Sequence, residues 1–136
     1  MRLLSWMGLS AAAGRLAAPR RRLVVFSRYG GLVVDEVVIE EAGRRLSEAA
    51  PPRTRVILFG SHARGEAGPN SDLDFLVIEP RVEDPVAESV RLRRALRGLV
   101  LAADVIVVSE QRVREWREVR GSLIGAALAE GRELAA

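Results

Sequence analysis

The chain has 136 residues, 49% of them hydrophobic, which is enough for one small domain with a core of its own. It contains no Cys, which excludes disulfides, zinc–thiolate sites and thiol chemistry. The net charge is +3, and the charged residues are unevenly distributed along the chain. Residues 1–34 carry six Arg and no acid, whereas residues 35–136 carry fifteen Arg and eighteen acids. This slightly acidic larger part argues against a nucleic-acid partner. No apolar run approaches the roughly 20 residues that span a bilayer, so we expect a cytoplasmic protein without a membrane partner.

Residues 1–33 are rich in Arg and free of acids, a composition found in organelle transit peptides. Leu3–Ala13 resembles a weak signal-peptide core, but a Trp and a Gly interrupt its apolar run. We expect an N-terminal extension that is disordered or loosely packed, or that precedes a true start at Val33 or Val34. The domain would then comprise residues 34–136.

The first regular element is expected to be a helix over residues 34–49. Its apolar residues recur at helical spacing, whereas acids occupy the other face. The apolar positions are Val34, Val37, Val38, Ala42 and Leu46. Pro51-Pro52 ends this helix and leads into a strand.

Two short strands flank a polar loop, and this stretch is the most informative part of the chain. Arg55–Phe59 and Leu73–Ile78 have the β-branched and apolar content of buried strands. Asp72 and Asp74 lie at the mouth of the second strand, and side chains two residues apart on a strand leave the same face. Carboxylates held so close repel unless a proton or a cation lies between them, and oxygen ligands of this kind suit Mg²⁺ or Mn²⁺.

The pair Gly60-Ser61, at the end of the first strand, has the composition of a phosphate-binding turn. Gly lets a ligand approach the backbone closely, and Ser adds a hydroxyl beside N–H groups that could start a short helix. An isolated Asp-x-Asp is more often a turn or cap element than a metal site. The metal hypothesis therefore depends on the spacing between Gly60-Ser61 and the two Asp residues.

Asp84-Pro85 predicts the start of a second helix, because Asp is a good N-cap and Pro suits the first helical position. We expect this helix to run to about Val100. Its sheet-facing residues should be Val86, Val90, Leu96 and Leu99, and its water-facing residues Arg91, Arg93, Arg94 and Arg97.

Ala103–Val108 predicts a third core strand, with Asp104 as an acid near its start. Asp104 read alone is a weak signal, because an acid at a strand start can simply be solvated. Ser109 and Ser122 then predict the N-caps of two further helices, the second of which ends at Gly131.

The spacing described above resembles the signature of the polymerase-β-like nucleotidyltransferase superfamily. Gly60-Ser61 is followed by ten residues, Asp72, one residue and Asp74, and Ala63-Arg64-Gly65 comes shortly after the Ser. Within the superfamily, the sequence is most similar to the minimal nucleotidyltransferase (MNT) group of small prokaryotic proteins, over about residues 34–133. The resemblance implies an α/β nucleotidyltransferase fold, with a mixed sheet of three or four strands and helices packed mainly on one face.

The same resemblance implies roles for the motif residues. Asp72, Asp74 and Asp104 would be catalytic and would bind two Mg²⁺ or Mn²⁺ ions about 3.5–4 Å apart. Asp104 would also draw a proton from the attacking hydroxyl. Gly60 and Ser61 would bind the β- and γ-phosphates of an NTP, with ATP as the expected substrate.

Other residues near the motif have open roles. Arg64 either neutralises triphosphate charge or pairs with a nearby acid, and Ser71 either contacts a phosphate or caps the strand. His62 is the only His, and we assign it no role because the family spacing leaves its position variable. Trp6 and Trp116 are interpreted as packing or interface residues.

The implied activity is transfer of a nucleoside monophosphate, AMP, from an NTP to a hydroxyl, with release of pyrophosphate. Small MNT proteins are commonly encoded beside a HEPN-domain ribonuclease, so the resemblance implies an antitoxin that adenylylates this toxin. The alternatives are a stand-alone enzyme acting on a small molecule and a non-catalytic module that inhibits the toxin by contact. The intact carboxylate set argues against the last of these.

Overall fold

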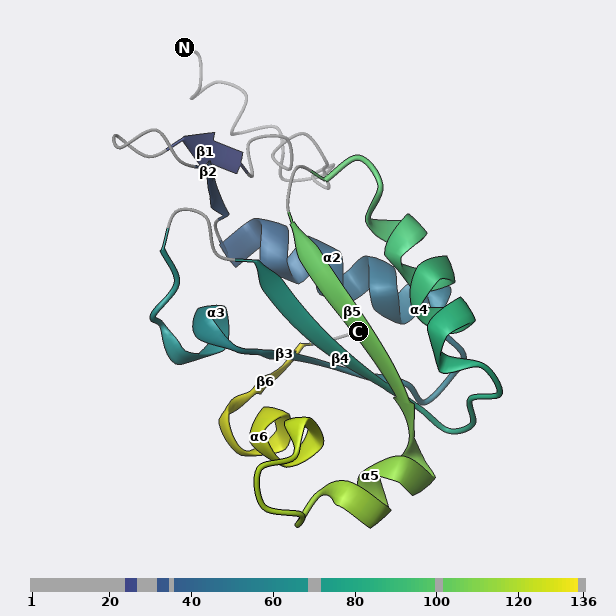
Figure 1. Ribbon diagram of the computed structural model, residues 1–136. Coiled ribbons are helices and arrows are strands. Elements are labelled where there is room, and N and C mark those ends of the chain that lie inside the picture. The colour runs from purple at the N-terminus through teal and green to yellow at the C-terminus, as the bar shows by residue number, and fades with distance from the viewer. Residues whose placement is uncertain (1–23, 27–31, 35, 69–71, 100–101, 135–136) are drawn as a thin grey trace, which may run out of the picture.

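The computed structural model describes residues 24–26, 32–34, 36–68, 72–99 and 102–134. Its centre is a four-stranded mixed sheet of order β5-β4-β3-β6 (Figure 1). Strands β3 and β4 are antiparallel, as are β3 and β6, whereas β4 and β5 are parallel. The strands are Arg55–Phe59 (β3), Leu73–Glu79 (β4), Ala103–Ser109 (β5) and Arg132–Leu134 (β6). The predicted mixed sheet is therefore confirmed, and β6 is a short strand that the sequence does not signal.

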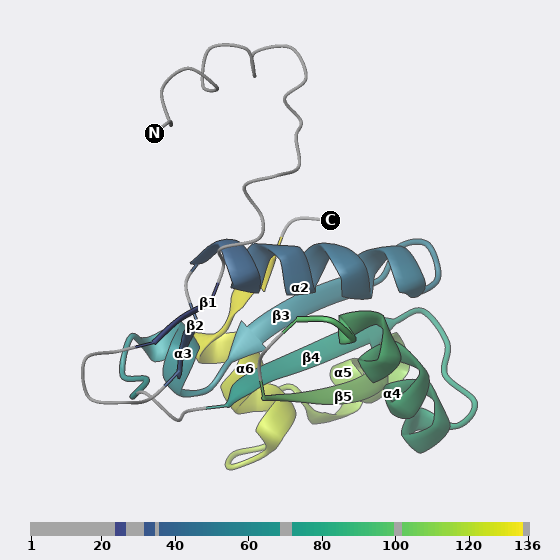
Figure 2. The same cartoon turned by 90° about the horizontal axis from the view of Figure 1, so that it is seen from above.

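Helices cover both faces of the sheet, so the expectation of helices mainly on one face needs correction (Figure 2). The first face packs against α2 (Glu36–Ala49) and α4 (Pro85–Arg93), and the second against α5 (Glu110–Trp116) and α6 (Leu123–Glu130). The reason is that the strands are apolar on both sides. In β3, Leu58 is buried on the α2 side, whereas its neighbour Ile57 packs against α5 and α6.

Helix α2 begins at Glu36 and not at Val34, because Val34 pairs with Val24 in a short antiparallel ribbon. The ribbon consists of β1 (Val24–Phe26) and β2 (Leu32–Val34), which are the only parts of residues 1–34 that the structure describes. The rotation of α2 also differs from the prediction, since Val37 is 46% exposed and Ile39 is buried instead. The apolar face of α2 is therefore displaced toward Ile39.

Helix α4 is shorter than predicted, and it is rotated about its axis so that a different set of side chains faces the sheet. A 3₁₀ turn, η2 (Arg94–Leu96), follows it directly, and Val100 lies outside the described residues. Val86 is 74% exposed and Val90 is 49% exposed, so their predicted burial is wrong. Leu92 and Leu96, four residues apart, are buried against the sheet in their place.

The predicted helix caps are confirmed. The Asp84 carboxylate accepts a hydrogen bond from Ala87 N at 3.1 Å, Ser109 Oγ accepts one from Arg112 N at 3.1 Å, and Ser122 Oγ accepts one from Gly125 N at 3.0 Å. These bonds satisfy N–H groups that have no partner within the helix. Helix α6 ends at Gly131 as predicted.

No helix within the described residues is long and apolar enough to cross a lipid bilayer.

Candidate functional site

The parallel pairing of β4 and β5 brings two of the predicted site residues together. Asp74 and Asp104 are Cα partners across the two strands, one residue inside the start of each strand. Asp72 lies one residue before β4 and is exposed, as is Asp104, whereas Asp74 is half-buried. Residues two and four positions further along each strand share a face with Asp74 and Asp104, and they pack against α5 and α6, so the site lies at one end of that face. These residues are Leu76, Ile78, Ile106 and Val108.

The electrostatics of Asp74 show that the three carboxylates interact. Burial raises the pKa of Asp74, and the negative charges of Asp104 and Asp72 raise it further. Electrostatic interactions with His62 and Arg64 lower the pKa of Asp74. Asp74 is therefore at the centre of a cluster of like charges that its protein neighbours compensate only in part.

The donor set fits a hard divalent ion by its chemistry. Carboxylate oxygens are the ligands that Mg²⁺ and Mn²⁺ prefer, and the partly uncompensated charge around Asp74 is what a cation would neutralise. Within the described residues, however, no three His, Cys, Asp or Glu side chains are arranged as a preformed metal site. The carboxylates of Asp72 and Asp104 would have to adjust around an ion.

Gly60 lies directly against Asp74, and a larger residue would not fit there. Its φ of 81° and ψ of −157° belong to a region that is open essentially to Gly alone. A Cβ built on Gly60 would overlap the Oδ2 atom of Asp74. The Gly60 carbonyl also accepts hydrogen bonds from Ala63 N and Arg64 N, both at 3.1 Å, and so starts the short helix α3 (Ser61–Arg64). Ser61 is thereby held beside the carboxylate cluster.

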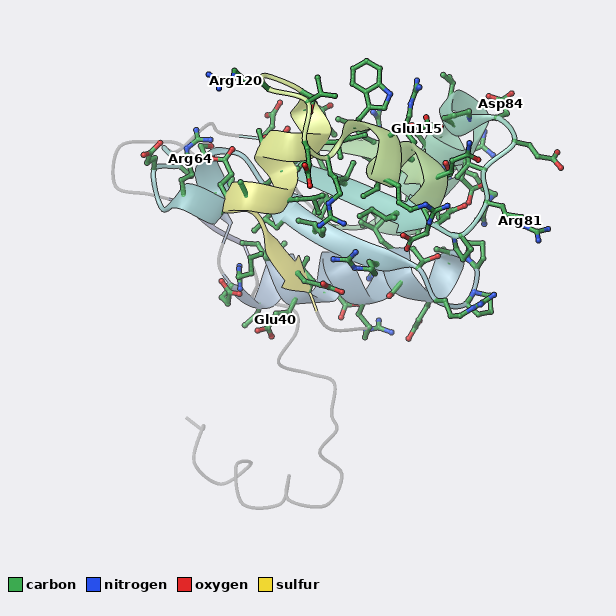
Figure 3. The ribbon with its side chains drawn as sticks, turned by 90° about the horizontal axis from the view of Figure 1, so that it is seen from below. Glu40, Arg64, Arg81, Asp84, Glu115 and Arg120 are labelled. Atoms are coloured by element: carbon green, nitrogen blue, oxygen red, sulfur yellow. The ribbon has the colours of Figure 1, made fainter. Side chains whose placement is uncertain are left out.

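Arg64 forms the acid pairing that the sequence left open. Its Nε donates to Glu66 Oε1 at 2.8 Å, and one of its terminal nitrogens donates to Glu130 Oε1 at 3.1 Å. The hydrogen bond to Glu66, followed by the one to Glu130, raises the pKa of Arg64. Since Glu130 ends α6, Arg64 links α3 to α6, and Figure 3 shows it at this end of the molecule.

Sequence reasoning missed two features of the site. The sequence indicates no role for His62, but His62 lies close enough to Asp74 to lower the pKa of that carboxyl, and only the fold shows this proximity. Glu130 is 66 residues from Arg64 and gave no signal in the sequence. Ser71 lies outside the described residues.

We expect Gly60→Ala to destabilise the protein more than Gly65→Ala. Gly65 also has a positive φ, of 75°, but a Cβ there meets no atom within 4 Å. The Gly65 variant should cost about 1–2 kcal/mol in the free energy of unfolding, from backbone strain alone. The Gly60 variant should cost more, because it adds the overlap with Asp74 and lies in a region more restricted to Gly. Urea unfolding of both variants measures the difference, and equal costs would contradict the described packing.

A double-mutant cycle separates the two causes at Gly60. The Asp74→Ala substitution removes the carboxylate that the new Cβ would meet but leaves the backbone strain in place. We therefore expect Gly60→Ala to cost less in the Asp74→Ala background than in the parent.

Comparison with known proteins gave one family and one related structure. The family model described as the nucleotidyltransferase domain matches residues 39–132, a range that contains all of the site residues discussed above. No curated protein matches the chain. A solved structure described as a toxin–antitoxin with AMP-PNP is 23% identical over 71% of this chain and 73% of that chain, with a TM-score of 0.46. A likeness at this level does not transfer a ligand or a partner to the present chain.

Proposed function

Because the chain belongs to the nucleotidyltransferase domain family, we propose that residues 34–136 transfer AMP from ATP to a hydroxyl group on a partner protein. The observation that carries this proposal is the register of β4 and β5, which puts Asp104 opposite Asp74. Asp72 precedes the same strand, and Gly60 lies against the Asp74 carboxylate. Carboxylates and a bare glycine backbone are thus gathered at one end of the sheet.

In this proposal the acceptor hydroxyl attacks the α-phosphorus of ATP, and the bond from that phosphorus to the pyrophosphate oxygen breaks. Asp104 accepts the hydroxyl proton, a role that its exposed position permits. Asp72, Asp74 and Asp104 would hold two Mg²⁺ ions, which supply charge neutralisation for the triphosphate and activation of the hydroxyl. Because Asp74 is half-buried between its two like-charged neighbours, it is the carboxylate that would orient the other two.

The phosphates of ATP are assigned to the turn after β3. Gly60 exposes its backbone next to Asp74, and Ser61 adds a hydroxyl at the start of α3. Ser71, which directly precedes Asp72 in the sequence, is proposed as a further phosphate contact. Arg64 is already bonded to two acids, so we propose that it holds α3 against α6 and adds positive potential to the site, and does not itself grip the triphosphate.

The acceptor is proposed to be a Tyr or other hydroxyl side chain of a HEPN-domain toxin encoded beside this protein. The support for a protein acceptor is the openness of the site, since Asp72 and Asp104 are both exposed. Small molecules are generally held in sites that enclose them. An exposed base on the edge strand β5 suits a side chain that protrudes from another protein.

The test is intact-mass measurement of the HEPN protein after incubation with this protein, ATP and Mg²⁺. We expect the mass of one or more AMP residues to be added to the partner. Replacing ATP by its α,β-methylene analogue should prevent the addition, because the bond that must break is then a P–C bond. No added mass, together with toxin neutralisation by an Asp72→Asn/Asp74→Asn variant, would favour inhibition by contact and overturn the proposal.

A further inference from the structure

Three arginine side chains, at the end of α4 and in and just after the turn η2, lack partners in the part of the chain that the structure describes. Arg93, Arg94 and Arg97 are exposed, and their guanidinium groups make no hydrogen bond or ion pair with described residues. Nearby arginines behave differently: Arg91 pairs with Glu88 at 2.6 Å, and Arg45 pairs with Glu41 at 2.9 Å. Among the described residues, Glu41 and Glu88 therefore pair with other arginines and leave these three side chains without an acidic partner.

The same three arginines surround a pocket. It has a volume of about 320 Å³ and is lined by Val90, Arg93, Arg94, Leu96, Arg97 and Ala103. Its apolar lining comes from one helix, one turn and the first residue of β5. An anionic group that enters this pocket would meet several guanidinium groups around apolar walls, and guanidinium matches carboxylate geometry with two parallel hydrogen bonds.

The pocket lies at the same end of the sheet as the carboxylate site. Ala103, which lines the pocket, is followed directly by Asp104, and successive side chains on a strand point to opposite faces. Strand β5 is one of the two edge strands of the sheet, and α4 packs beside it (Figures 1 and 2). A molecule that approaches this edge can therefore contact both the pocket and Asp104.

The exposed apolar residues of α4 extend this surface. Val86, Val90 and Arg93 are spaced four and three residues apart, so they share one side of the helix. Exposed valines in line with arginines match a protein segment that carries both apolar and acidic side chains. A nucleic-acid backbone offers no apolar counterpart to Val86, which is the more exposed of the two valines.

We propose that Arg93, Arg94 and Arg97, together with Val86 and Val90, form a docking site for an acidic segment of the acceptor protein. Carboxylates of the segment enter the arginine pocket, and its apolar side chains cover the two valines. Docking at this edge holds the acceptor hydroxyl near Asp104. The identity of the docked protein as the acceptor rests on the proposed function, whereas the preference for an acidic segment rests only on this surface.

The first test measures binding of a fluorescein-labelled peptide in which Glu and Leu recur at helical spacing. The variant R93E/R94E/R97E reverses the charge around the pocket. The control variant is R114E/R117E/R120E, because Arg114, Arg117 and Arg120 are also exposed and their side chains have no partner among the described residues. We expect the pocket variant to weaken peptide binding by about tenfold or more and the control variant by less than about twofold. Equal weakening in both variants would show that the net charge of the protein alone explains the loss of peptide binding, and would overturn the proposal. Tighter binding of a single-stranded RNA of matched charge, or binding of inorganic phosphate in place of the peptide, would also overturn it.

The second test uses the HEPN partner and separates this inference from the proposed function. We expect R93E/R94E/R97E to raise the KM for the partner by about tenfold while kcat and the affinity for ATP stay within about twofold of the parent. An unchanged KM with active transfer would overturn the docking site and leave the proposed function standing. If no transfer occurs at all, the proposed function fails, and the peptide measurement still decides whether the pocket binds acidic segments.

Discussion

Asp74→Asn is expected to reduce nucleotidyl transfer by about 10²–10³-fold or more, because it neutralises the central carboxylate of the site. Asp74 pairs with Asp104 across the parallel strands, lies against Gly60 and interacts with the charge of Asp72. An amide of the same shape keeps these contacts but removes a negative charge that a divalent ion would require. The measurement is the rate at which AMP is added to the acceptor, at saturating ATP and Mg²⁺.

The same variant should fold at least as stably as the parent in metal-free buffer. Burial and two like charges oppose the ionised form of Asp74, so the removal of its charge relieves repulsion. Glu40→Gln is the matched control, because Glu40 is an exposed acid on α2 with no partner among the described residues (Figure 3). The control should retain both activity and melting temperature. Full transfer activity in Asp74→Asn would show that the Asp74 carboxylate is not needed for catalysis.

Glu79→Gln is expected to stabilise the protein above pH 7 and to have little effect near pH 5. Glu79 ends β4 and is 2% exposed, and its Oε2 atom has no hydrogen-bond partner among the residues that the structure describes. Burial, followed by its hydrogen bond with Glu88 and the negative charge of Glu88, raises the pKa of Glu79 to about 7, although the charge of Arg91 lowers it. The Glu88 carboxylate keeps its charge because Arg91 donates two hydrogen bonds to it, at 3.0 and 2.6 Å. The structure therefore favours a protonated Glu79 beside an ionised Glu88.

The sign of the pH dependence follows from the raised pKa. An unfolded Glu loses its proton near pH 4.5, whereas folded Glu79 keeps it until about pH 7. The contribution of Glu79 to stability is therefore fully present below pH 4.5 and is lost progressively as the pH rises to about 7. Gln has the shape of the protonated form, can donate to Glu88 and does not titrate. Above pH 7 the Glu79→Gln variant should exceed the parent in free energy of unfolding by at most about 3 kcal/mol, which is the free-energy equivalent of raising the pKa of Glu79 from 4.5 to about 7.

Urea unfolding at pH 5 and pH 8.5 measures this effect. Glu83→Gln is the control, because Glu83 is exposed in the loop that follows β4 and has no partner among the described residues. Its unfolding free energy should follow that of the parent at both pH values. A Glu79→Gln variant that is destabilised equally at both pH values would show that Glu79 is ionised in the folded protein.

Local features of the chain were predictable from the sequence because their partners are near neighbours along the backbone. The caps Asp84, Ser109 and Ser122 each accept a hydrogen bond from a residue three positions further on. The turn at Gly60-Ser61 and its spacing to the Asp pair also lie within one stretch, and this stretch was sufficient to identify the nucleotidyltransferase family. Each of these signals depends on a few consecutive residues, so composition and spacing describe it fully.

The tertiary structure decided the features that depend on how distant segments meet. Strand β6 has only three residues and exists because β3 provides hydrogen-bonding partners for it, a dependence that no periodicity in so short a segment can reveal. The exposure of Val86 follows from the rotation of α4 about its own axis, since burial of Leu92 turns the valine outward. The proximity of Asp104 to Asp74 is set by the register of two parallel strands thirty residues apart in the sequence. The sequence by itself therefore determined the family and the local caps, whereas packing between remote elements decided the contacts of Asp74 and Gly60, the Glu79–Glu88 pair and the arginine pocket on α4.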